Sequence, residues 1–172
     1  MTTLQTEVAE VAERTGFSGA VRVDREGDTV VCAAYGLADR AHGIPATVDT
    51  QFAMASGTKS LTAVTVMALV EQGTLRLDTT ARSLLGEDLP LVGDGVTVEH
   101  LLAHRSGIGD YLDDGSGGNV RDYALPVPVH ELATSEAYLR VLDGRPRVFA
   151  PGERFTYTNS GYVLLAVLAG RA

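Results

Sequence analysis

The chain has 172 residues, of which 45% are hydrophobic, and carries a formal net charge of −8 at pH 7. This length and composition suit one folded domain with a buried core. Because a net negative charge repels a phosphate backbone and the sequence has no basic run, we expect no nucleic-acid partner. No apolar stretch is long enough to span a membrane and no signal peptide is recognisable, so we expect no membrane partner and a cytoplasmic location.

The first 55 residues predict a helix followed by a β-hairpin. Glutamates lie between apolar residues at helical spacing in residues 1–14, which is typical of an amphipathic surface helix. Residues 18–35 hold two β-rich segments around a turn sequence, which predicts an antiparallel hairpin. Cys32 is the only cysteine, so no internal disulfide can form, and its apolar neighbours predict a place in the core. Residues 36–50 are expected to form a connecting loop.

The rest of the chain predicts mainly helices. Apolar residues at helical spacing follow Ser56 and end at Gly73, a typical C-cap residue, so Ser56 is expected to open a helix. Three further helices and one long loop rich in Gly, Asp and Pro are expected, with the helices at residues 97–104, 135–142 and 160–169 and the loop at residues 107–128.

Lys59 is the only lysine in the chain, against thirteen arginines, and it lies three residues after Ser56. Unlike arginine, lysine can give up its proton near neutral pH when its surroundings disfavour the charge. Residues i and i+3 of a helix share a face, so the Lys59 amine can hydrogen-bond the Ser56 hydroxyl, and the helix N-terminus favours an ionised nucleophile. The pattern predicts Ser56 as a nucleophile and Lys59 as its base. The alternative is a surface lysine that lies near a serine by chance.

Tyr157 and Asn159 form a second pair, between a Pro-Gly turn and the last expected helix. A phenol beside a lysine cation is biased toward phenolate and can take a proton from Ser56. The Asn159 amide can hydrogen-bond both a substrate carbonyl and Lys59. The alternatives are a core or rim tyrosine with a satisfied hydroxyl at 157 and a helix N-cap at Asn159.

Four segments extend these two motifs into a longer pattern, Phe52–Ser60, Leu69–Asp78, Val96–Ile108 and Pro151–Tyr162. Together they resemble the β-lactamase-related serine hydrolases, a group that contains class C β-lactamases, D-alanyl-D-alanine carboxypeptidases, D-aminopeptidases and β-lactamase-like esterases. The resemblance covers residues 16–172. It implies an α+β fold of the β-lactamase/transpeptidase type, with an antiparallel sheet flanked by helices and a helical subdomain.

The same resemblance assigns roles to residues of the two motifs. It implies that Ser56 is the acylated nucleophile, that Lys59 and Tyr157 form the proton-transfer pair, and that Asn159 positions the substrate. No cofactor and no metal are implied. The expected function is a serine hydrolase that acts through an acyl-enzyme on a small-molecule ester, amide or β-lactam. The missing secretion signal favours a cytoplasmic esterase or amidase over a cell-wall peptidase.

The chain departs from the family in one respect. The third family motif, a Lys-Thr-Gly or His-x-Gly triplet on a later strand, is absent, and His104–Gly107 precedes the Tyr-x-Asn element instead of following it. In the family the corresponding part supplies the second oxyanion-hole N–H and most of the central sheet. We therefore expect a partial domain over residues 1–172, with a sheet lobe at 1–55, a helical lobe at 56–172 and no C-terminal strands.

Two consequences of this departure stay open. The missing C-terminal half can act as a separate partner chain, or a homo-oligomer can complete the site. Alternatively, the chain is a non-catalytic, truncated homologue that acts by binding.

Other functional patterns are weak or absent. His100 and His104 have the i, i+4 spacing of a metal pair but lack a third ligand, and the resemblance implies that they are structural. Asp110–Gly115 is similar to a calcium loop without its final glutamate, and we expect a solvated turn there. The sequence has no Gly-x-Ser-x-Gly elbow, phosphate loop or dinucleotide fingerprint, which argues against α/β-hydrolases and nucleotide enzymes.

Overall fold

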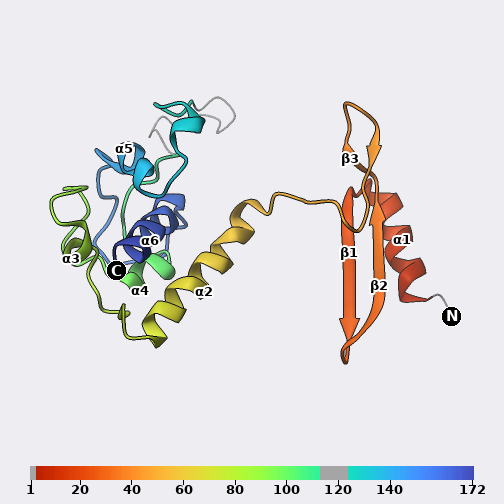
Figure 1. Cartoon of the computed structure of the whole chain (residues 1–172), viewed down its shortest axis with the longest axis horizontal. Helices are drawn as coiled ribbons and strands as arrows, with labels where there is room; N and C mark the ends of the chain where they lie inside the picture. Colours follow the sequence, from red (N-terminus) through yellow and green to blue (C-terminus); the bar gives the residue numbers. More distant parts are fainter. Residues whose placement is uncertain (1–2, 113–123) are drawn as a thin grey trace. The chain divides into compact units, whose positions relative to one another are not determined.

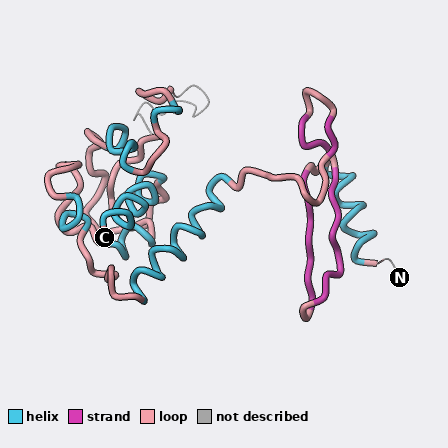
Figure 2. Tube along the Cα trace, in the orientation of Figure 1, coloured by secondary structure: helices cyan, strands magenta, loops and turns pink. Residues whose placement is uncertain are grey.

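The computed structural model describes residues 3–112 and 124–172. The chain divides into two compact units, Met1–Ala55 and Ser56–Ala172. Figure 2 shows strands together with one helix in the first unit, and helices and loops in the second.

The first unit consists of a helix and two small antiparallel sheets (Figure 1). Its elements are α1 (Leu4–Thr15), β1 (Gly19–Arg25), β2 (Asp28–Tyr35), β3 (Leu37–Asp39) and β4 (Ile44–Pro45). The Thr3 side chain caps the start of α1, and Gly16 ends it in the left-handed conformation that glycine adopts without strain. β1 pairs with β2, β3 pairs with β4, and α1 packs against β2.

The predicted N-terminal helix and hairpin are confirmed, but the prediction for Cys32 is wrong. Val31 is buried, with 2% of its surface exposed, whereas Cys32 is exposed. Successive strand residues point to opposite faces, so the burial of Val31 turns the next residue away from the core. The segment 36–50 is more ordered than expected, because β3 and β4 pair within it.

The second unit is built around α6, the last helix. Its elements are α2 (Thr58–Glu71), α3 (Ala81–Leu85), α4 (Val98–Leu102), α5 (Leu139–Leu142) and α6 (Asn159–Arg171), with short 3-10 turns η1 (Ala55–Gly57), η3 (Val129–Glu131) and η4 (Glu136–Tyr138). α6 packs against α2, α3 and α4 (Figure 1). Four of its aliphatic side chains are no more than 1% exposed, namely Leu164, Leu165, Val167 and Leu168.

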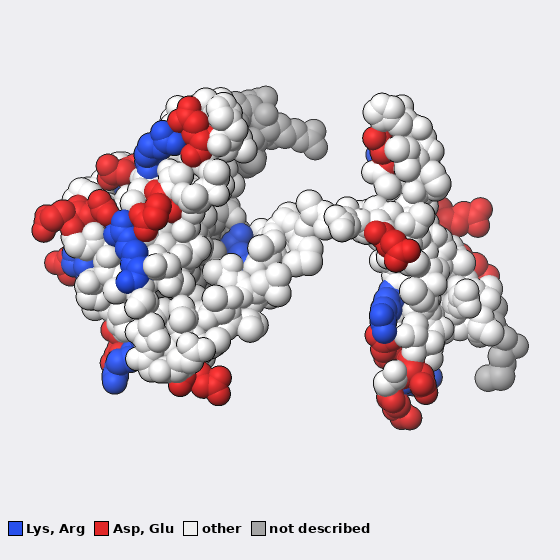
Figure 3. Space-filling model, viewed as in Figure 1, with Lys and Arg blue, Asp and Glu red and all other residues white. Residues whose placement is uncertain are grey.

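α2 shows two different faces. Val66 is fully buried against the core, while Leu61, Val64 and Met67 are 59%, 67% and 44% exposed. These three residues follow each other at intervals of three along the helix, so they form one apolar stripe, which we call the outer face of α2. Figure 3 shows that the surface over α2 is largely free of charged side chains.

The predicted helices at 97–104 and 160–169 are confirmed as α4 and α6, with small shifts at their ends. The predicted helix at 135–142 is interrupted, because its first turn has 3-10 geometry as η4 before α5 begins. α3 was not expected. Part of the predicted loop at 107–128, residues 113–123, lies outside the described residues, and so does the second half of the calcium-like sequence, residues 113–115.

Candidate active site

Ser56 and Lys59 meet at the beginning of α2. Ser56 lies in the 3-10 turn η1 that leads into α2, so the expectation that it opens the helix is off by two residues. Lys59 is in the first turn of α2, and its Nζ donates to Ser56 Oγ at 3.1 Å. The i, i+3 spacing therefore brings the two side chains into contact, as the sequence suggested.

Tyr157 and Asn159, which lie near the C-terminal end of the unit's sequence, contact Ser56 and Lys59. The hydroxyl of Tyr157 lies 2.6 Å from Ser56 Oγ. Lys59 Nζ also donates to Asn159 Oδ1 at 2.9 Å. The packing of α2 against α6 brings these residues together although about a hundred positions separate them in the sequence.

Asn159 is not the N-cap of α6, which was one of the roles considered for it from the sequence. The N-cap of α6 is Thr158, and Asn159 is the first helical residue. The Asn159 side chain does not cap the helix but faces Lys59. Of the two roles considered for this residue, the N-cap is therefore wrong.

The surroundings of Tyr157 favour its ionised form. Lys59 Nζ lies 4.9 Å from the centre of the Tyr157 ring. Hydrogen bonding with Lys59, and then with Ser56, lowers the pKa of the Tyr157 phenol from its usual value. Because the side chain is about half exposed, solvent weakens this electrostatic effect. By contrast, burial raises the pKa of Tyr162, whose hydroxyl donates to the carbonyl of Leu102.

His104 stacks between two of the tyrosines at the site. Its ring centre lies 4.6 Å from that of Tyr157 and 4.9 Å from that of Tyr162. The Nδ1 atom accepts a hydrogen bond from the backbone N–H of Thr158 at 3.2 Å, which requires Nδ1 to be unprotonated. Burial, and then the charge of Lys59, lowers the pKa of the imidazole, so it is held neutral at physiological pH.

Asp110 is a site residue that the sequence reasoning missed. Its Oδ2 accepts from the backbone N–H of Asn159 at 2.6 Å and from the Asn159 side-chain Nδ2 at 3.2 Å. The sequence placed Asp110 in a solvated turn, but the residue is half-buried against α6. No local signal could have indicated the contact, because Asp is common in turns rich in glycine.

The described parts of the chain contain neither a candidate metal site nor a helix that could cross a membrane. In residues 3–112 and 124–172, no group of three or more His, Cys, Asp or Glu side chains could hold a metal ion. His100 uses its Nδ1 to accept from the backbone N–H of Thr97 in the capping box of α4. Over the same residues, none of the helices combines the length and the hydrophobicity that crossing a bilayer requires.

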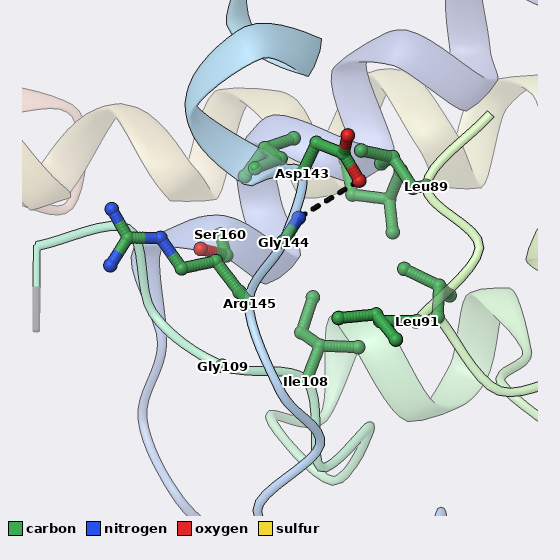
Figure 4. Close-up of a pocket in the computed structure, with 11 residues that line it drawn as sticks. Leu89, Leu91, Ile108, Gly109, Asp143, Gly144, Arg145 and Ser160 are labelled. Atoms are coloured by element: carbon green, nitrogen blue, oxygen red, sulfur yellow. Dashed lines mark hydrogen bonds between the residues drawn. The ribbon is translucent and has the colours of Figure 1, made fainter. Parts of the chain in front are cut away.

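A small pocket lies beside the site, where Ile108 faces Leu89 and Leu91 (Figure 4). Gly109 and Ser160 also line it, whereas the four predicted site residues do not. The lining is largely aliphatic. The pocket thus lies among residues 89–92, 108–109, 142–145 and α6 rather than in the cluster around Ser56.

Comparisons with known proteins identify the family. The family model "Beta-lactamase" matches residues 4–172. The chain therefore belongs to the β-lactamase family. Esterase EstB of Burkholderia gladioli is 37% identical over 166 residues, which are 87% of this chain and 40% of that protein. Penicillin-binding protein 4* of Bacillus subtilis is 33% identical over 172 residues, 98% of this chain and 36% of that protein.

A solved structure extends the match to the fold. The penicillin-binding protein from Bacillus halodurans matches with a TM-score of 0.82 and 34% identity, over 95% of this chain and 49% of that one. The expected β-lactamase/transpeptidase-like α+β fold is confirmed. The chain spans less than half the length of each of these three relatives.

Proposed function

We propose that this protein is a serine hydrolase in which Ser56 forms an acyl-enzyme. The observation that carries the proposal is the position of Ser56 Oγ, within hydrogen-bond distance of both Tyr157 OH and Lys59 Nζ. A nucleophilic hydroxyl needs a neighbouring base that can take its proton, and this cluster supplies two candidates. Membership of a family with hydrolase relatives, including an esterase, supports the same reaction class.

In the proposed first step, Ser56 Oγ bonds to the substrate carbonyl carbon and gives its proton to Tyr157. The carbonyl electron pair moves onto the oxygen, and the Lys59 ammonium stabilises the phenolate form of Tyr157 that accepts the proton. Collapse of the tetrahedral intermediate breaks the bond to the leaving group, which takes the proton back from Tyr157. General base assistance of this kind contributes about 10²- to 10⁴-fold in rate.

In the second step, water attacks the acyl-enzyme. Tyr157 takes a proton from the water, the new C–O bond forms, and Ser56 leaves with that proton as the acid is released. In both steps the amide oxygen of Asn159 faces the site and accepts a hydrogen bond from Lys59 Nζ at 2.9 Å. The substrate class is an ester, an amide or a β-lactam, since all three present a carbonyl carbon to Ser56.

We also propose that further polypeptide completes the site. The relatives are more than twice as long as the part that this chain matches, and the third family motif is not found in these 172 residues. The outer face of α2 presents apolar side chains that a covering layer would bury. Such a layer would supply the second oxyanion-hole donor, whose loss costs about 10²- to 10³-fold in rate.

The test compares hydrolysis of a chromogenic short-chain ester and a chromogenic cephalosporin by the 172-residue chain and by a longer polypeptide that contains it. Turnover of at least one substrate should be higher for the longer polypeptide by about 10²-fold or more. Ser56→Ala should abolish it. Ser60→Ala is the matched control, because Ser60 is exposed on the same helix and its hydroxyl takes part in none of the hydrogen bonds that join Ser56, Lys59, Tyr157 and Asn159, and it should keep activity.

Two results would count against the proposal. Turnover that survives in Ser56→Ala would remove Ser56 from the reaction. A longer polypeptide without Ser56-dependent turnover of either substrate would favour the non-catalytic alternative. Equal turnover by the two lengths would contradict only the need for further polypeptide.

A further inference from the structure

The carboxylate of Asp110 forms hydrogen bonds with Asn159, one of the residues of the candidate site. Oδ2 of Asp110 accepts from the backbone N–H of Asn159 at 2.6 Å and from the side-chain Nδ2 at 3.2 Å. We propose that Asp110 is a positioning residue that fixes the Asn159 amide in one orientation, with its oxygen toward Lys59. This inference rests on the proposed function, since the orientation matters for the reaction through Lys59.

The chemistry of the three groups allows one orientation of the amide. A carboxylate only accepts hydrogen bonds and an ammonium only donates them. An amide between the two must therefore turn Nδ2 to Asp110 and Oδ1 to Lys59, and the observed contacts follow this rule at 3.2 and 2.9 Å. The amide dipole then lies between a negative and a positive group, which strengthens both hydrogen bonds.

Without the carboxylate, the Lys59 ammonium alone would select this orientation. The oxygen and nitrogen of an amide have nearly the same size, so a flip about the last side-chain bond changes hydrogen bonding and leaves packing intact. In the flipped state Nδ2 would face the Lys59 ammonium, donor against donor. Lys59 would lose its acceptor at 2.9 Å and keep its hydrogen bonds with Ser56 and Tyr157.

The Asp110 carboxylate is itself held in place. Its Oδ1 accepts from the backbone N–H of Leu112 at 3.0 Å. The backbone N–H of Tyr111, the next residue, donates to Ser160 Oγ at 2.8 Å, and Ser160 is buried on α6. The loop also approaches its neighbour closely at Gly107, where a Cβ would collide with the carbonyl oxygen of Phe149. These contacts place the carboxylate with little freedom to move.

A purely structural role is the competing explanation. A carboxylate at the N-terminus of α6 stabilises the helix through the backbone N–H of Asn159, whatever the side chain at 159 does. The two roles differ in which atom of Asn159 matters. The positioning role requires Nδ2, whereas the structural role requires only the backbone, so the test must separate the two atoms.

The first measurement reads the amide directly and needs no catalysis. The chain has only two asparagines, Asn119 and Asn159, so selective labelling of Asn with ¹⁵N gives two side-chain NH₂ signals, and Asn119→Ser identifies them. Hydrogen exchange of the Asn159 NH₂ should be slow in the unsubstituted chain and at least about 10-fold faster in Asp110→Ala. Ser160→Ala, which breaks the other loop contact to α6, should leave this rate within about 3-fold. Equal exchange in Asp110→Ala and the unsubstituted chain would overturn the inference.

The second measurement is a double-mutant cycle on the rate at which a fluorophosphonate modifies Ser56, followed by intact mass. Asp110→Ala should slow modification by about 10- to 100-fold. In an Asn159→Ala background the same substitution should change the rate by less than about 3-fold, because the amide it positions is gone. Thermal unfolding of all four proteins reports the backbone role, which should persist in both backgrounds.

The outcomes separate this inference from the proposed function. If Ser56 is never modified in the unsubstituted protein, the proposed function fails and the catalytic part of the inference fails with it. If Ser56 is modified but Asp110→Ala slows the reaction equally with and without the Asn159 amide, only the inference fails. Asp110→Asn should give rates of NH₂ exchange and of Ser56 modification between those of the unsubstituted chain and those of Asp110→Ala. The reason is that an amide at 110 cannot accept from both Leu112 and Asn159.

Discussion

α2 and α6 carry the two halves of the candidate site at or just before their N-termini, yet their burial differs sharply. In α6, six residues are buried, and most of them belong to the core. In α2, which the structure describes from end to end, Val66 is the one buried residue, and the outer face is exposed. The Asn159 half therefore rests on a fixed helix, whereas the Ser56 half rests on a helix with one uncovered side.

This difference in burial between α2 and α6 shows which side of the cluster is already held in place. Asn159 is held by Asp110 and by the core below α6, in addition to its contact with Lys59 of α2. Ser56 and Lys59 depend on contacts across to α6, through Tyr157 and Asn159. Four predictions test the contrast.

The largest effect is expected at the α2 end of the site. Lys59→Arg should slow modification of Ser56 nearly as much as Lys59→Ala, by about 10²- to 10⁴-fold, because a guanidinium keeps the charge but does not fit between Ser56 and Asn159. The measurement is the rate of Ser56 modification by a fluorophosphonate. Near-normal modification in Lys59→Arg would mean that Lys59 contributes charge alone.

The second effect compares stability on the two helices. Leu165→Ala leaves a cavity in the core of α6 and should lower the free energy of unfolding by about 2–5 kcal/mol. Val64→Ala, on the outer face of α2, should change it by no more than about 0.5 kcal/mol in the 172-residue chain. Urea unfolding of both variants measures the difference. Similar losses would show that the outer face of α2 is covered in solution, for example by a second copy of the chain.

The third effect concerns ionisation across the two halves. Lys59 lowers the pKa of Tyr157, so phenolate absorbance should show one tyrosine that titrates below the usual value of about 10 and disappears in Tyr157→Phe. Lys59→Met should move this step to higher pH, since the neighbouring cation is lost. If the phenolate is the base, the rate of Ser56 modification should rise with pH along the same step. A rate that is flat across it would exclude Tyr157 as that base.

The smallest effect is a change in the pH dependence of stability. The pKa of His104 is lower in the folded chain than in the unfolded one, where it is about 6.5. As pH falls below about 6.5 the unfolded state takes up the proton first, so the free energy of unfolding decreases until the folded-state pKa is passed. Lys59 and Asp110 are the charged groups that influence the ring, with opposite signs.

His104→Asn is the variant that isolates this effect. Asn tolerates the positive φ of 55° at this position and can accept from Thr158, but it does not titrate. The variant should lose less stability than the unsubstituted chain between neutral and mildly acidic pH. Parallel curves for the two proteins would mean that His104 has the same pKa folded and unfolded.

Local periodicity was enough to predict much of the fold. The N-terminal helix and hairpin, α4 and α6 follow from repeats of apolar residues with cap or turn residues at their ends. α3 was missed because five residues are too few to show a helical period. Cys32 was misplaced because an apolar run does not reveal which strand face is covered, and that depends on where α1 packs.

In the candidate site, too, contacts between residues close in sequence could be predicted and contacts between distant residues were harder to predict. The contact of Ser56 with Lys59 is a local consequence of i, i+3 spacing, so the sequence alone could suggest it. Tyr157 and Asn159 have no local relation to Ser56, so their predicted place beside it rested on side-chain chemistry and on the family resemblance. Asp110 was missed by both routes, because its partner lies 49 residues away and a single aspartate in a loop carries no pattern.

The nucleophile is identified most directly by mapping the residue that an acylating or phosphonylating reagent modifies. After exposure to a fluorophosphonate or a β-lactam, intact mass should show one adduct, and peptide mapping should place it on Ser56. The adduct should be lost in Ser56→Ala and kept in Ser60→Ala, whose hydroxyl is outside the cluster. An adduct of equal yield in Ser56→Ala, or one mapped to another residue, would contradict the assignment of Ser56 as the nucleophile.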